Sequence, residues 1–349
     1  MKKLLVIIPC LLSLYGCGLF EWPGHVGGDG KIASNLKAVG YDELPGWKDD
    51  DHNYALQAFR NSCGAKIQYA GKVIPDRQLF EEKCKLLPPG PAGRETIRKW
   101  FENHFQPYKV VDDTGGKFTG YYSPVVSACR YQTSKCSAPI MDKPSDGREY
   151  KGVHSAKLVS ERIGNVIYWI DPIDLQDMGA ATLILEDGEK VRLSVASTND
   201  LPFNGIGSQL LARGIRPPEG YGMKSVRKYL KENRALAEDL IANNPRYVYY
   251  THAETDAITG NMGVPLSRIR SIAVDKNIYT LGLPVYLDTR LSNGKKFQRL
   301  MVAQDTGGAV TGYNRADIYF GVGDAAFEYA QGQNERGQMY ILMPKQNNN

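Results

Sequence analysis

The chain has 349 residues, and its 43 Lys and Arg against 38 Asp and Glu give a net charge of +5. With 42% hydrophobic and 23% charged residues, the composition excludes a disordered or collagen-like chain, and the length predicts about two domains. The excess of positive charge is small and scattered, so it gives no reason to expect a nucleic-acid partner.

Residues 1–16 resemble a secretory signal peptide, with two lysines before an apolar stretch, Leu4 to Leu14, that is too short to span a bilayer. Cys17 follows Leu-Tyr-Gly, which is similar to the lipobox of bacterial lipoproteins. The alternative is an ordinary signal peptide with an incidental Cys. Because Gly18 replaces the Asp of the inner-membrane retention signal, we expect Cys17 to carry a lipid anchor on the periplasmic face of the outer membrane.

Four cysteines besides Cys17 remain after residue 16: Cys63, Cys84, Cys129 and Cys136. An oxidising periplasm allows two disulfides, and the local pairing, Cys63 with Cys84 and Cys129 with Cys136, is the simplest. Free thiols are the alternative. The cysteine spacing fits no zinc pattern and the five histidines are scattered, so we predict neither a metal site nor a cofactor.

The first half of the chain changes from helical to β-rich texture. Residues 40–105 show apolar residues at helical spacing, and residues 118–126 have the Tyr and Val of a strand. Residues 127–155 are polar and predict a long surface excursion. Apolar and polar residues alternate over residues 165–196 around a turn at Asp187-Gly188, which predicts a hairpin.

The second half begins with the clearest helix, residues 225–242, which Pro245 follows. Short strands are then expected at 247–250, 269–274, 285–287, 300–303, 318–320 and 340–343. Many short strands separated by turn signals are typical of a β-barrel. We therefore predict a mainly β fold with flanking helices.

Two aspartates stand out because GxSxG, P-loop, HExxH and GxGxxG motifs are absent from the sequence. Asp305 ends a strand and precedes Gly307 and Gly308, which permit a tight turn with positive φ. Asp317 lies in a second strand, on the face of Tyr319. A turn between neighbouring strands would bring together two carboxylates, the usual equipment for cleaving glycosidic bonds. The alternative for Asp305 is a turn cap bonded to its own backbone.

Several segments together resemble a known family. Residues 268–275, 303–309 and 317–321 resemble the 3D module, whose three aspartates match Asp275, Asp305 and Asp317. Leu44–Trp47, Ala55–Cys63 and Phe118–Pro124 are similar to segments of the membrane-bound lytic murein transglycosylase A family. The resemblance runs from about Leu44 to Pro344, in the family's order.

The resemblance implies a double-psi β-barrel domain and a smaller inserted β-domain, with a glycan-binding groove between them. The barrel domain would comprise residues 17–124 and 225–345, with the 3D module at about 265–345, and the inserted domain residues 125–224. The implied substrate is the glycan strand of peptidoglycan, and the anchor would reach the outer membrane. The sequence does not identify partner proteins among the enzymes that make or degrade the cell wall.

The resemblance also implies a lytic transglycosylase, which cuts the β-1,4 bond between N-acetylmuramic acid and N-acetylglucosamine and leaves a 1,6-anhydro ring. Asp317 matches the family's catalytic acid and Asp305 its supporting carboxylate. The acid requires a raised pKa, from burial or a nearby like charge. Further residues are expected to contact substrate: Thr119, Tyr121, Tyr122, Gly307, Gly308 and Asp275.

Two features depart from this pattern. In relatives, the inserted domain has a Gln-Gly-Ser-Gly-like segment that faces the groove. Here Gln176 is not followed by Gly-Ser-Gly, so we infer no glycan contacts on that side of the groove. Residues 113–121 match residues 305–313 at seven of nine positions, which makes Asp113 a rival for the acid. Two other functions stay open: a non-catalytic peptidoglycan-binding lipoprotein, and a hydrolase that uses both carboxylates and water.

Overall fold

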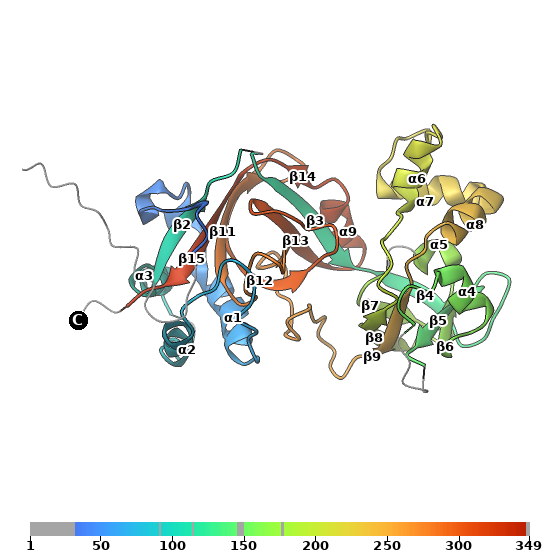
Figure 1. Ribbon diagram of the computed structural model, residues 1–349, viewed down its shortest axis with the longest axis horizontal. Helices are drawn as coiled ribbons and strands as arrows, with labels where there is room; N and C mark the ends of the chain where they lie inside the picture. Colours follow the sequence, from blue (N-terminus) through green and yellow to red (C-terminus); the bar gives the residue numbers. More distant parts are fainter. Residues whose placement is uncertain (1–31, 91, 114, 145–149, 176–177, 347–349) are drawn as a thin grey trace, which may run out of the picture.

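The computed structural model describes residues 32–90, 92–113, 115–144, 150–175 and 178–346. The expected signal peptide, Cys17 and Gln176 lie outside the described residues. Two β-sheets form two units that lie next to each other (Figure 1). Within the described part of the chain, no helix combines the length and apolar character needed to cross a bilayer.

The barrel unit contains a nine-stranded sheet that curls into an arch (Figure 1). The strand order is β1-β2-β15-β11-β12-β10-β13-β3-β14. The β10–β12 and β3–β13 pairs are parallel, and the other neighbours are antiparallel. The strands are β1 (Leu36–Ala38), β2 (Phe105–Val110), β3 (Lys117–Ser123), β10 (Ser271–Val274), β11 (Pro284–Arg290), β12 (Lys296–Thr306), β13 (Arg315–Val322), β14 (Asn334–Glu335) and β15 (Gln338–Pro344).

Helices cover the ends of this arch and close its core (Figure 1). They are η1 (Tyr41–Glu43), η2 (Trp47–Asp49), α1 (His52–Cys63), α2 (Arg77–Lys85), α3 (Arg94–His104) and α9 (Asp324–Ala330). Asp51 begins α1 by accepting a hydrogen bond from the Asn53 amide. Phe59 of α1 and Phe101 of α3 are fully buried against the sheet. Cys63 and Cys84 form a disulfide between α1 and α2, the local pairing expected from the sequence.

The insert unit, residues 125–252, contains a six-stranded sheet in the order β5-β6-β4-β7-β8-β9. The chain enters it directly from β3 into β4 (Figure 1). A second disulfide joins Cys129 to Cys136. The elements are β4 (Val125–Cys129), β5 (Ala138–Asp142), α4 (Ser155–Ser160), β6 (Asn165–Ile170), α5 (Pro172–Leu175), β7 (Ala181–Ile184), β8 (Lys190–Thr198), α6 (Ile206–Ala212), α7 (Met223–Glu232), α8 (Arg234–Ala242) and β9 (Val248–His252).

The structure moves the expected end of the insert from residue 224 to His252, so assigning residues 225–252 to the barrel domain was wrong. β9 pairs antiparallel with β8. Leu230 of α7 and Leu240 of α8 pack with Leu210 of α6, in an apolar cluster separate from the barrel core. The apolar face that marked this stretch as a helix is therefore buried inside the insert.

Two local predictions also need correction. The single helix at 225–242 is two helices that meet at Asn233, where φ is −126° and ψ is 62°. The Asn233 side chain donates to the Tyr229 carbonyl, 2.8 Å away, and ends α7. The surface excursion at 127–155 contains β5, whose Ile140 and Met141 are fully buried. The mainly β fold with flanking helices and an inserted β unit is confirmed.

Candidate active site

Three adjacent strands position the two aspartates on one face of the barrel sheet. β10 lies between β12 and β13, and its Ala273 pairs with Asp305 on one side and Asp317 on the other. Since neighbouring strands are about 4.8 Å apart, the two aspartate Cα atoms are separated by roughly 10 Å. On this strand, only the small side chain of Ala273, which is buried, lies between them.

The alternate residues of the same strands face the barrel core. Ala316, Ile318 and Phe320 of β13 are buried in the main apolar cluster, whereas Asp317 faces away from it. Gln304 also faces inward, where its amide nitrogen donates to the Ala58 carbonyl of α1 at 2.8 Å. The packed core therefore holds the strand positions that carry the aspartates.

Among the residues that the structure describes, Asp317 has one hydrogen-bond donor and a charged neighbour. The Thr119 hydroxyl of β3 donates to Asp317 Oδ1 at 2.6 Å, because β3 and β13 are parallel and in register at these residues. Arg315 donates in turn to Thr119 Oγ1 at 2.8 Å. Burial raises the pKa of Asp317, and the charge of Asp305 raises it further, against the opposing effects of Thr119 and Arg315.

Asp305 has three donors. The amides of Asn261 and Thr306 donate to Oδ1, both at 2.8 Å, and the Tyr121 hydroxyl donates to Oδ2 at 2.9 Å. Burial raises the pKa of Asp305, and these three hydrogen bonds lower it. Burial and Asp305 hold the Tyr121 pKa well above its usual value, so this hydroxyl stays a neutral donor. The ionised form is thus better supported at Asp305 than at Asp317.

The turn after Asp305 differs from the expectation. Gly307 and Gly308 do not have positive φ values. Gly307 is needed for another reason, because a Cβ there would lie 2.9 Å from Val310 Cγ2. Asp305 does bond to its following amide, as the turn-cap interpretation predicted, and it also contacts Tyr121 of another strand.

Two of the predicted substrate contacts make contacts within the protein. Asp275 accepts hydrogen bonds from the amides of Asn277 at 2.9 Å and Gly312 at 3.0 Å, so it holds the loop that follows β12. Tyr122 lies on the core side of β3 and packs on Phe327 of α9, with 5.2 Å between ring centroids. The residue type of Tyr122 gave no sign of this, because its side of the sheet is decided by strand alternation.

The repeated DTGG segment is not a structural repeat. Gly115 and Gly116 have φ values of 74° and 65°, unlike Gly307 and Gly308. The segment beginning at Lys117 forms β3, whereas its counterpart beginning at residue 309 is a loop. Asp113 is exposed on the turn before β3. The similarity in sequence therefore gives no structural support to Asp113 as the acid.

Sequence reasoning missed residues that border the site from outside the strands. Gly260 packs against β12, since a Cβ there would lie 2.6 Å from the Gln304 carbonyl oxygen. Burial raises the pKa of Tyr319 to about 12, and the positive charge of Arg192 of β8 opposes this rise. Among the described residues, no group of three or more His, Cys, Asp or Glu side chains could hold a metal ion. Through Arg192, the insert brings positive charge toward the aspartate face.

Comparison with known proteins gives matches across both units. Residues 270–343 match the 3D domain, and residues 117–251 match the MltA specific insert domain. The membrane-bound lytic murein transglycosylase A of Vibrio cholerae is 27% identical over 224 residues, which cover 60% of each chain. The alignment thus spans less than two thirds of that relative.

Solved structures match over more of the chain. The membrane-bound lytic murein transglycosylase of Agrobacterium tumefaciens is 26% identical, with a TM-score of 0.79 and coverage of 89% of this chain and 98% of that one. Escherichia coli MltA with bound chitohexaose is 22% identical, with a TM-score of 0.68 and coverage of 91% and 97%. The second likeness concerns the fold alone.

Proposed function

Because the chain belongs to the MltA family and carries a C-terminal 3D domain, we propose that it is a lytic transglycosylase acting on peptidoglycan. The observation that carries the proposal is the unequal support of two carboxylates on one face. Asp305 accepts three hydrogen bonds, whereas Asp317 accepts one from Thr119. One group is thereby suited to stay charged and the other to carry a proton.

We propose that the glycan strand lies across this face, between the barrel and insert units. Chitohexaose, the ligand named for the E. coli structure of the same fold, is an oligomer of β-1,4-linked amino sugars. Thr119 and Tyr121, beside the aspartates, would border the sugar rings. We leave Asp275 and Tyr122 out of the proposed contacts. Asp275 accepts a hydrogen bond from the loop after β12, and Tyr122 packs on Phe327 on the core side of β3.

In the proposed reaction, one carboxyl group serves twice. Protonated Asp317 gives its proton to the glycosidic oxygen as the C1–O bond breaks. The C6 hydroxyl of the same muramic residue attacks C1, and ionised Asp317 takes the hydroxyl proton. The nucleophile is part of the substrate, so its proximity is supplied without a bound water. Ionised Asp305 raises the pKa of Asp317 and stabilises positive charge developing at C1.

A lipid anchor on Cys17 would hold the enzyme at the outer membrane, facing its polymer. The name of the V. cholerae relative, which describes a membrane-bound protein, supports this proposal. We propose cleavage after residue 16 and acylation of Cys17. Cys17→Ala should abolish palmitate labelling, and globomycin, which blocks the later cleavage step, should leave a labelled precursor that keeps its signal peptide. A labelled Cys17→Ala protein would contradict the proposal.

Product analysis tests the function. Sacculi digested with protein that starts at Gly18 should yield fragments with 1,6-anhydromuramic ends by mass spectrometry. Reducing ends would indicate the two-carboxylate hydrolase, and binding without release would indicate a non-catalytic wall protein. Asp317→Asn should abolish the anhydro products, and Asp113→Asn, which changes the same residue type in the similar DTGG segment, should not.

A further inference from the structure

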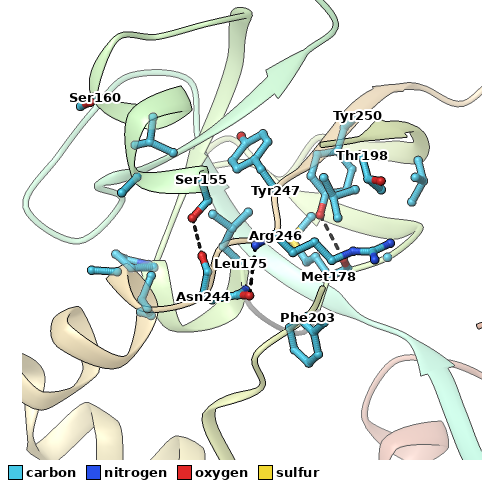
Figure 2. Close-up of a pocket in the computed structure, with 18 of the residues that line it drawn as sticks. Ser155, Ser160, Leu175, Met178, Thr198, Phe203, Asn244, Arg246, Tyr247 and Tyr250 are labelled. Atoms are coloured by element: carbon cyan, nitrogen blue, oxygen red, sulfur yellow. Dashed lines mark hydrogen bonds between the residues drawn. The ribbon is translucent and has the colours of Figure 1, made fainter. Parts of the chain in front are cut away.

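Arg246 extends from the insert unit toward the barrel unit. It lies between Pro245 and the start of β9, and its Nη1 is 4.0 Å from where a Cβ on Gly308 would be. Gly308 is three residues after Asp305 in the turn that follows β12. Figure 2 shows the Arg246 side chain reaching away from Asn244. A cation carried by the insert thus lies beside the loop that begins at a candidate catalytic carboxylate.

No anionic partner for the Arg246 guanidinium is found among the residues that the structure describes. In the described part of the chain, the hydrogen bond found for this residue is that of its backbone amide to Asn244, and no ion pair is found. Four other arginines of the insert, Arg130, Arg213, Arg227 and Arg234, form ion pairs with carboxylates, as Arg234 does with Asp171 at 2.8 Å. Arg246 is nevertheless half-buried. A partly desolvated guanidinium without a carboxylate is suited to bind one from a ligand.

Arg246 also borders a cavity of about 500 Å³ inside the insert unit (Figure 2). Its other walls include Leu175, Met178, Phe203 and Tyr250, so the interior is mostly apolar. Of the described residues that line it, Glu238 is the carboxylate, and it is exposed on α8, where it acts on the charge of Arg234. The cavity therefore combines an apolar interior with a free cation at the edge nearest the aspartates.

We propose that this cavity and Arg246 bind the peptide stem of muramic acid, with the guanidinium on a stem carboxylate and the alanine methyl groups inside. This inference rests on the proposed function. The stem is attached at the lactyl group of the sugar whose C1 would react at Asp317, so it must leave the glycan close to the aspartates. Its alternation of small apolar side chains with free carboxylates matches what the cavity offers.

Two forms of one polymer test the proposal. Peptide-bearing glycan strands and strands stripped by an N-acetylmuramyl-L-alanine amidase are compared as substrates. Arg246→Gln should lower kcat/KM about tenfold or more on peptide-bearing strands, as expected for a lost charge-assisted hydrogen bond, and should leave the value on stripped strands unchanged. Arg246→Lys should recover part of the loss. Arg216→Gln, at an exposed arginine of the insert, should change neither value.

Equal losses on both substrates would mean that Arg246 holds the units together, and no loss on either would mean that it binds nothing. Both outcomes overturn the proposal. Binding separates its failure from that of the proposed function. If the unaltered protein releases no anhydro products from either polymer, the function fails, and the affinity of Asp317→Asn for peptide-bearing strands is then measured with and without Arg246→Gln. A loss of affinity confined to these strands still supports the stem site.

Discussion

Asp305 and Asp317 have the same side chain, and their neighbours give them different chemistry. Both are half-buried, which raises both pKa values. The two backbone amides and the phenol on Asp305 oppose this effect directly. Asp317 accepts a hydrogen bond from the Thr119 hydroxyl, and the negative charge of Asp305 raises its pKa. We therefore expect the proton to reside preferentially on Asp317, and two experiments on these residues follow from that expectation.

Asp317→Asn is expected to stabilise the fold at neutral pH. An aspartate whose folded pKa lies above its ordinary value of 3.8 binds more protons folded than unfolded between those two values. Stability therefore falls as pH rises through this window, and the cost is fully present above the folded pKa. Asn resembles the neutral form and can still accept from Thr119. Thermal unfolding at pH 7 should show a higher Tm for the variant, by about 2 to 4 °C per kcal/mol gained.

The same reasoning predicts that the Tm difference shrinks as pH falls through the raised pKa of Asp317 toward 3.8, because the unaltered carboxyl then binds its proton. Asp113→Asn, at an exposed aspartate, controls for the loss of a negative charge. A Tm difference that stays constant between pH 4 and pH 7 would show that burial of Asp317 does not affect its protonation.

Asp305→Asn is expected to shift the pH dependence of the reaction. The negative charge of Asp305 raises the pKa of Asp317, so its removal lowers that pKa. The pH above which kcat falls should then move to a lower value, because the acid loses its proton earlier. The measurement is kcat against pH on solubilised glycan strands. An unmoved basic limb together with a uniform loss of rate would assign Asp305 to charge stabilisation at C1 alone.

At the scale of elements, the approach of β3 to β13 sets the Thr119–Asp317 contact. Gly120 lies on the core side of β3, where a Cβ would be 2.5 Å from Cε2 of the buried Phe320. Gly120→Ala should therefore destabilise the barrel unit by about 1–3 kcal/mol and lower the activity through misplaced Thr119. Chemical denaturation measures the first effect and turnover of sacculi the second.

Gly207→Ala is the matched control, because a Cβ at this position of α6 meets nothing within 4 Å. It should leave activity unchanged and slightly stabilise the helix. If Gly120→Ala were as stable and active as the control, the close packing of β3 on Phe320 would not govern the site.

Strand alternation explains which site residues could be predicted from the sequence. The DTGGA and FTGYY segments and the face of Asp317 were identifiable because a strand has a period of two. The packing of Tyr122 on the core side could not be predicted, because which side of β3 faces the core depends on long-range pairing. Asn261 and Arg246 carry no local signal, since only the folded loop and the position of the insert bring them to the site. The end of the insert was misplaced for the same reason, because β9 pairs with a strand about 50 residues earlier.

At the scale of the whole molecule, the two units have separate cores. The main apolar cluster contains buried residues up to Phe118 and from Ile272 onward, and none from the insert. The insert has its own clusters. Described contacts between the units include the Ser123 hydroxyl with the Ala180 carbonyl, at 2.7 Å, and Lys224 with Glu328, at 3.2 Å. The barrel unit should therefore fold without the insert.

Replacing residues 125–252 by a flexible Gly-Ser linker of about 10 residues tests this separation. We expect a cooperative thermal transition and an intact Cys63–Cys84 disulfide, because every residue of the main cluster is retained. Turnover of sacculi should be lost, since the shortened protein keeps Asp305 and Asp317 but lacks the wall opposite them. A shortened protein that unfolds would show that the barrel needs the insert for stability, and one that retains full activity would show that the aspartate face alone binds and cleaves the glycan.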